Sequence, residues 1–483
     1  MRVPRVFVVA AVALSLVSGV ASPQAAVESE DRVDRIVGRV MARGGAHAFL
    51  QRLTDTIGGR VTGSPESRAT SDLLLRALRD AGFEDAHFEE YALVSRWQRG
   101  RAAGSVVSPV TRPLAFASYG WAPGTKGEVT ASLVDLGAPP NDDSAVPADR
   151  VRGAAVIVEP YGVKEAPGQV MRAALARKLA RAGAAVMLIP SDKPHRMLYT
   201  SAFGFYPGAP LPVLSVARED VLFLRRLLAK GPVRVTFDVG NTADTTPARE
   251  RNVVADIRGT TPGEVVLVGA HLDSWDFGQG AQDDGVGVAA VLEAARVLKS
   301  LGIQPRRTIR FVFFSGEEQG LLGSRAYIEA HRKELDSLRA AVIMDDGAQT
   351  PRGFKIHGRS DVEAAARNAL APLSSLGASG VSLEATFDMD HGPFLAEGIP
   401  VFTLWVDPGE YDTHHHALSD TLDKVDPQML ALDTAVMAVT AYRLADAPEA
   451  PGRRLSSAEA TRLLEKVGLE SLHRAVYEPF AAR

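Results

Sequence analysis

Two adjacent carboxylates, Glu317 and Glu318, follow the apolar run RTIRFVF in the segment FSGEEQG. Three other segments place acidic or imidazole side chains at a predicted strand end or helix start: VGAHLDSW, GAQDDGVG and VIMDDG. A later loop, YDTHHHALSD, adds three consecutive histidines. Carboxylates that converge at one place repel one another unless cations or protons compensate their charge. The pattern therefore predicts a metal site.

The residue types of these segments indicate which metal they would hold. Carboxylate and imidazole together suit zinc, and the chain has no cysteine, which argues against a purely structural zinc site. Charge counting favours two ions, because three carboxylates and one hydroxide balance the four positive charges of two Zn²⁺. Asp283 is the natural bridge, since a carboxylate can give one oxygen to each ion of such a pair.

The order of the motifs resembles that of the co-catalytic zinc exopeptidases, the family that includes bacterial leucyl aminopeptidases and carboxypeptidase Q. The motifs are HLD at His271–Asp273, DDG at Asp283–Gly285, SGEEQGLLGS, the strand end MDD, and H-x-x-x-D-T at His416–Thr421. The spacing of 12 residues from His271 to Asp283, and of 34 from Asp283 to Glu317, is similar to that of the family. The resemblance covers roughly residues 45 to 445.

The resemblance implies two zinc ions per chain and five metal ligands: His271 and Asp345 for one zinc, Glu318 and His416 for the other, and Asp283 shared between them. It also implies that Glu317 is the general base. Asp273 would be the carboxylate that orients His271 and fixes its tautomer. Asp420 would support the ligand loop.

Two ligand positions carry alternatives. The family often shows N-x-D at the third ligand, whereas this chain has IMDDG, so Asp346 could take the place of Asp345. Among the three histidines, His416 fits the family's spacing to the D-T pair, and His414 and His415 do not.

Two further features follow from the resemblance. The segment DMDHGPF is similar to a loop near the substrate, where Asp390 and His391 would either line the pocket or support it. Family members hold the two aspartates of the DDG motif across a cis peptide bond, so we expect one between Asp283 and Asp284.

The N-terminus predicts export. A short basic segment, MRVPR, precedes the apolar stretch VFVVAAVALSLVSGV and the small residues ASPQAA, which is typical of a secretory signal peptide over residues 1–26, cut after Ala21 or Ala26. We therefore expect a secreted or periplasmic protein with no membrane association after the signal is removed. A net charge of −4 gives no electrostatic argument for nucleic acid as a partner.

Composition and the pattern of predicted strands and helices divide the remaining chain into segments. From RNVVADIRG onward, buried strands such as EVVLVGA and TIRFVFFS alternate with helices, which predicts an α/β domain with a mixed, largely parallel sheet flanked by helices. We assign residues 27–115 and 241–447 to this catalytic domain and 448–483 to a helical tail. Residues 116–240 are rich in Gly, Pro and short strands with one helix, and resemble an inserted protease-associated-type domain that supplies no catalytic residue.

The resemblance implies a secreted dizinc metallo-exopeptidase that hydrolyses short peptides or dipeptides, as an aminopeptidase or dipeptidase. A carboxypeptidase of the carboxypeptidase Q type is an alternative, and it would need a cation for the terminal carboxylate of its substrate. A catalytically inactive, receptor-like binding module is an alternative of another class, against which the complete set of ligand positions argues. Relatives of the carboxypeptidase Q type also suggest a homodimer.

Overall fold

The structure is a computed structural model that describes residues 23–137, 146–159, 165–203 and 208–474. Most of the predicted export signal, residues 1–26, lies outside these ranges. A search of the described residues finds no helix that is both long and apolar enough to cross a membrane.

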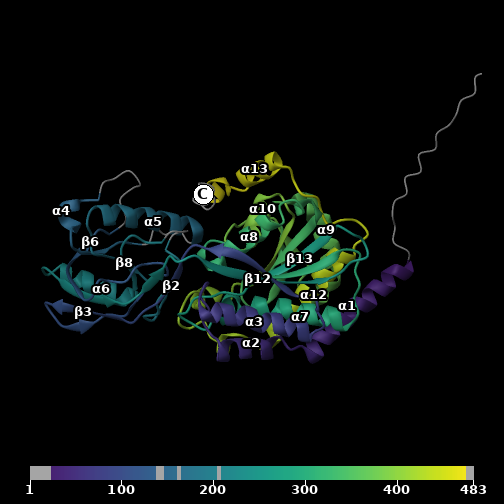
Figure 1. The fold of residues 1–483 in the computed structure, drawn as a ribbon, viewed down its shortest axis with the longest axis horizontal. Coiled ribbons are helices and arrows are strands. Elements are labelled where there is room, and N and C mark those ends of the chain that lie inside the picture. Colours follow the sequence, from purple (N-terminus) through teal and green to yellow (C-terminus); the bar gives the residue numbers. More distant parts are fainter. Residues whose placement is uncertain (1–22, 138–145, 160–164, 204–207, 475–483) are drawn as a thin grey trace, which may run out of the picture.

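An eight-stranded mixed sheet forms the larger part of the molecule (Figure 1). Its strands lie in the order β1 (His87–Leu93), β12 (Ala248–Ile257), β14 (Thr308–Phe314), β13 (Val265–His271), β15 (Leu338–Ile343), β18 (Val401–Val406), β16 (Pro351–Lys355) and β17 (Gly380–Ser382). The four central strands β14, β13, β15 and β18 are parallel, whereas β12 pairs antiparallel with both of its neighbours and β16 pairs antiparallel with β18. The predicted mixed, largely parallel sheet is confirmed.

Helices cover both faces of this sheet because its central strands are apolar on both sides. In β13, Val266 and Val268 pack into one core and Leu267 into the other. The first core contains residues of α1 (Pro23–Arg43), α2 (Ala46–Thr56), α3 (Pro65–Asp80), α7 (Val286–Ser300), α9 (Glu363–Leu370) and α12 (Pro427–Asp446). The second contains residues of α8 (Leu322–Ala330), α10 (His391–Ala396) and α13 (Ser457–Lys466), and Figure 1 shows the two helical layers on opposite sides.

A second eight-stranded sheet lies beside the first (Figure 1, left). Its order is β4 (Arg112–Pro113), β3 (Ala102–Ser108), β10 (Arg234–Val239), β6 (Val129–Asp135), β7 (Ala155–Ile157), β8 (Val186–Pro190), β9 (Val213–Val216) and β5 (Phe116–Ser118). Helix α5 (Glu165–Arg181) packs on one face and α6 (Arg218–Leu228) on the other, while α4 (Ala148–Val151) is a single turn. A two-stranded ribbon of β2 (Arg96–Gln98) and β11 (Thr242–Asp244) joins the two sheets at the points where the chain leaves and returns.

This second unit, residues 102–239, differs from the sequence expectation in two respects. It begins with β3 at Ala102 and not at residue 116, because β3 pairs along its length with β10. Most residues of β3 are exposed or half-buried, so its sequence carries little apolar alternation. The unit also has a second long helix, α6, which buries Val221 and Leu224 against the sheet, whereas the sequence expectation gave this region one helix.

Candidate metal centre

The candidate residues meet at the carboxyl edge of the parallel strands, where open α/β sheets bind ligands. His271 is the last residue of β13, and Asp345 follows β15 by two residues. Glu317 and Glu318 form a single helical turn after β14. Asp283 lies in the turn before α7, and His416 follows the short helix α11 (Tyr411–His414).

Gly316 explains how the two neighbouring glutamates leave the strand. Its φ is +76°, and a Cβ at this position would lie 2.8 Å from the hydroxyl of Tyr91. Only glycine adopts this backbone conformation readily, so the chain can turn sharply after β14. Glu317 and Glu318 both line the cavity that lies over the strand ends.

The first group of candidate ligands surrounds the imidazole of His271. Its Nε2 atom lies 3.1 Å from Oδ1 of Asp283 and 3.2 Å from Oδ1 of Asp345. Its Nδ1 atom lies 3.1 Å from the backbone oxygen of Asp273, to which it can donate, and this leaves Nε2 as the ligating atom. The Asp273 carboxylate is farther from the ring, at 3.7 Å, and accepts hydrogen bonds from the Thr62 hydroxyl and the Glu317 N–H.

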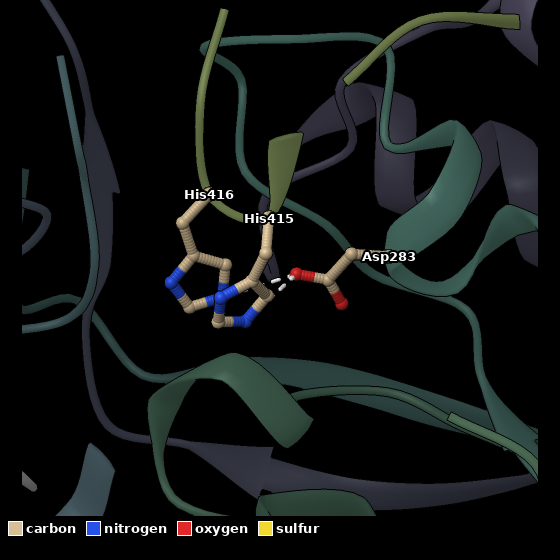
Figure 2. A group of neighbouring side chains, drawn as sticks. All are labelled: Asp283, His415 and His416. Carbon is tan, nitrogen blue, oxygen red and sulfur yellow. Dashed lines mark ion pairs between the residues drawn. The ribbon is translucent and has the colours of Figure 1, made fainter. Parts of the chain in front are cut away.

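The second group surrounds His416. Its Nε2 atom lies 2.9 Å from Oε2 of Glu318 and 3.1 Å from Oδ2 of Asp283. Figure 2 shows the Asp283 carboxylate directed at the two stacked imidazoles of His415 and His416. His415 lies close to the same carboxylate but at 3.6 Å, and it has no second acidic neighbour at ion-pair distance among the described residues.

Asp283 lies between the two groups, because one of its oxygens faces His271 and the other faces His416. The peptide bond that joins it to Asp284 is cis, as predicted. Asp420 holds this turn from the other side: its carboxylate accepts hydrogen bonds from the backbone N–H groups of Ala281, Gln282 and Asp283.

The structure also places the residues for which the sequence left alternatives. Asp345 faces His271, whereas Asp346 lies in the cavity wall, where burial raises its pKa to about 7. Asp390 and His391 are buried and are not among the cavity-lining residues. The His391 ring stacks on His357 with 4.1 Å between centroids, so the geometry favours a supporting role for this segment.

A cation would stabilise the buried, closely spaced carboxylates of the two groups. Burial raises the pKa of Glu318 and Asp345, with the larger rise at Asp345. Burial alone would lower the pKa of His271 and His416, yet the facing carboxylates raise both values well above the ordinary one. Oε1 of Glu318 is buried with no hydrogen-bond partner among the described residues. Buried carboxylate and imidazole groups in this arrangement fit zinc, whose positive charge would compensate them.

A cavity of about 840 Å³ opens over these groups, between the two sheets. The larger unit, which contains the first sheet, contributes Glu317 and four of the candidate ligands, Asp283, Glu318, Asp345 and His416. The inserted unit, residues 102–239, contributes Tyr119, Arg172, Lys193 and Tyr199 to the lining of the same cavity. A peptide bound against the strand ends would therefore contact both units.

Two residues at the centre were missed by the sequence analysis. Trp275 donates a hydrogen bond of 2.6 Å from its indole nitrogen to Oε2 of Glu318. The hydroxyl of Tyr199 lies 3.3 Å from Nδ1 of His416, although the inserted unit was expected to supply no site residue. Trp275 lies only two residues after Asp273, which is a usable signal, but nothing in the sequence marks Tyr199.

Comparisons with known proteins agree with the motifs. The profile of peptidase family M28 matches residues 252–441. Carboxypeptidase Q of Rattus norvegicus is 32% identical over 413 residues, covering 83% of this chain and 85% of the relative. A probable lipoprotein aminopeptidase of Mycobacterium tuberculosis is 29% identical, covering 81% of this chain and 82% of the relative.

A solved structure shares the whole architecture. The peptidase M28 precursor of Shewanella amazonensis superposes with a TM-score of 0.80 at 27% identity, covering 89% of this chain and 99% of the other. The extent of the match to carboxypeptidase Q, together with the family profile, establishes the relationship. The chain belongs to peptidase family M28, in agreement with the zinc exopeptidases that its motifs resemble.

Proposed function

We propose that the protein is an exported dizinc exopeptidase that removes single residues from short peptides. The observation that carries the proposal is the position of Asp283, whose two oxygens face two separate imidazole–carboxylate groups. His271 and Asp345 would hold one zinc, Glu318 and His416 the other, and Asp283 would bridge them. The signal-like pattern of residues 1–26 supports export.

The two ions, when bound, supply Lewis acidity that polarises a carbonyl group and acidifies water. Glu317 is the residue placed to move the proton. It lines the cavity beside the candidate ligands, and no described residue donates a hydrogen bond to its carboxylate. Glu317 takes a proton from the attacking water and delivers it to the nitrogen of the departing amine. Asp273 holds the backbone N–H of Glu317 and so positions the base.

A carboxypeptidase is the second candidate, and Arg172 favours it. This guanidinium is only 8% exposed, lines the cavity, and forms no ion pair or hydrogen bond with a described residue. An unpaired buried guanidinium is suited to a carboxylate, which it can bind through two parallel hydrogen bonds. Arg172 would therefore bind the C-terminal carboxylate of a peptide in the cavity.

A panel of dipeptides distinguishes the candidates: free, N-blocked and C-amidated forms of one sequence, tested with the zinc-loaded protein. An aminopeptidase or dipeptidase needs the free amine, and a carboxypeptidase needs the free carboxylate and tolerates the N-block. Arg172→Gln should raise KM for free-carboxylate substrates and leave the C-amidated substrate unaffected. Absence of hydrolysis for the whole panel would contradict the proposed function.

A further inference from the structure

His416 is held by a side chain from the inserted unit. The hydroxyl of Tyr199 lies 3.3 Å from Nδ1 of His416, and the two rings lie 5.4 Å apart at a tilt of 35°. Because Nε2 of His416 faces Asp283 and Glu318, the ring proton belongs on Nδ1, which donates it to the Tyr199 oxygen. Such a partner fixes the tautomer and the orientation of an imidazole ligand.

The backbone of His416 is held by the same segment. Its φ of +58° lies in the left-handed region, which residues other than glycine adopt only where the surroundings impose it. The N–H of Thr200 donates a 2.9 Å hydrogen bond to the His416 carbonyl, and Tyr199 pairs with Ala417 in an isolated β-bridge. Two consecutive residues of the inserted unit thus hold both the ring and the backbone of His416.

Glu318, the neighbour of His416, is held through Trp275. The indole N–H of Trp275 donates to Oε2 of Glu318 at 2.6 Å, and its ring meets His416 edge-on at 6.0 Å. The same indole packs edge-on against Trp121 of the inserted unit at 6.3 Å. A Cβ on Gly120 would lie 2.1 Å from the Trp275 ring, so the inserted unit is in direct contact with this side chain.

Arg99 connects the loop that contains Trp275 with the inserted unit. Its guanidinium donates to the carboxylate of Asp276, with Nε 3.0 Å and Nη2 2.9 Å from Oδ1. It also donates to the hydroxyls of Ser118 and Thr200, each at 3.1 Å. One side chain therefore connects the loop that contains Trp275 to the segment that contains Tyr199.

The other group of candidate ligands has no such connection among the residues that the structure describes. The His271 ring and N–H make polar contacts with Asp273, Asp283, Asp284 and Asp345, all within the larger unit. The two groups therefore differ in what supports them, although they share Asp283.

We infer that the inserted unit is a structural part of one of the two metal sites. Tyr199 is a positioning residue for His416, and Trp275 is a positioning residue for Glu318. The inference rests on the proposed dizinc function and adds an asymmetry to it: the site of Glu318 and His416 depends on the docked inserted unit, and the site of His271 and Asp345 does not.

The test is the zinc affinity of Tyr199→Phe, which removes one hydroxyl and keeps the ring. Zinc binding is measured by competition with a chromophoric chelator, so the readout does not depend on activity. We expect one of the two zinc ions to bind about 10–100-fold more weakly and the other to bind as in the wild type. The matched control is Tyr119→Phe, because the Tyr119 ring packs edge-on against Tyr199 but makes no hydrogen bond to His416, and it should keep both affinities.

Trp275→Phe provides a second variant, which removes the indole N–H and keeps an aromatic ring at the junction. It should weaken the same single zinc. Circular dichroism of both variants establishes that they are folded. Folded variants that bind two zinc ions with wild-type affinities would overturn the inference alone, whereas a wild-type protein that binds fewer than two would overturn the dizinc proposal itself.

Discussion

At the scale of single residues, the two adjacent glutamates have different surroundings. Oε2 of Glu318 faces His416 and Trp275, so this carboxylate is committed to the candidate metal site. Glu317 has no such partner among the described residues, and burial raises its pKa well above the ordinary value. A half-buried carboxylate without a fixed partner is suited to accept and return a proton.

Glu317→Gln should therefore retain the fold and both zinc ions but lose catalysis. The amide has nearly the same shape and cannot accept a proton, and loss of a general base lowers kcat by roughly 10²–10⁴-fold. The measurements are kcat on a cleaved dipeptide and zinc content per chain. A kcat near that of the wild type, with two zinc ions bound, would show that another group is the base.

Glu318→Ala should instead lose zinc and activity together. Removing this carboxylate takes away one ligand of the second site and leaves His416 with Asp283 alone. We expect zinc content after dialysis to fall from two ions towards one per chain, with kcat falling in parallel. Retention of two ions by this variant would exclude Glu318 as a ligand.

The residues that the sequence predicted best are those whose placement follows from strand register. His271, Glu317 and Asp345 end or follow neighbouring parallel strands, and such ends meet at one edge of a sheet. Tyr199 could not be predicted in this way, because it meets His416 across 217 positions of sequence. Its contact is set by how two units dock, which no local pattern encodes.

At the scale of elements, the turn before α7 depends on a single buried carboxylate. Asp420 accepts hydrogen bonds from three consecutive backbone N–H groups of this turn, which the chain cannot satisfy locally. Burial raises the pKa of Asp420 to about 7. The turn that carries Asp283 is thus positioned by a residue of the loop after β18.

Asp420→Ala should destabilise the fold by about 2–5 kcal/mol, because each orphaned buried N–H costs about 1–3 kcal/mol. The measurement is denaturant unfolding of the chelator-treated protein, so that zinc contributes to neither variant. The control is Asp423→Ala in the same loop, where the exposed carboxylate contacts only Thr421 and Lys424 among the described residues. An equal loss in both variants would contradict the role given to Asp420.

The link between β1 and α8 should make stability depend on pH. Nε2 of His331 lies 2.9 Å from Oε1 of Glu89, and this hydrogen bond raises the pKa of His331. Because the folded pKa exceeds the unfolded value of about 6.5, the contribution is complete below that pH and is lost as the pH rises through the folded pKa. The Tm difference between the wild type and His331→Gln should therefore be larger at pH 6 than at pH 9. A difference independent of pH would show that His331 acts through packing on Tyr327 alone.

The elements themselves were predictable where their apolar pattern was strong. Strands β13 and β14 and helix α7 are buried along nearly their whole length, and their sequences show it. Helix α6 was not predicted although its apolar residues recur at helical spacing, whereas β3 was missed because most of its residues remain accessible. Strand β3 forms because it pairs with β10, and its local composition alone does not indicate a strand.

At the scale of the whole molecule, the substrate cavity belongs to neither unit alone. The larger unit supplies four candidate ligands and Glu317 to its lining, while the inserted unit supplies Arg172, Lys193 and Tyr199. A cavity that is closed on one side by a second unit suits short peptides better than folded chains. The contact between the two units that shapes the cavity also holds His416. Access of a peptide to the site and assembly of the site therefore depend on the same contact.

Peptide hydrolysis should require two zinc ions held by this set of ligands. The direct test is to titrate Zn²⁺ into verified metal-free protein while measuring hydrolysis of a dipeptide that the zinc-loaded protein cleaves. We predict no hydrolysis without metal and a rise to a plateau at two zinc ions per chain. Full activity in the metal-free protein, or a plateau at one ion per chain, would contradict a dizinc mechanism.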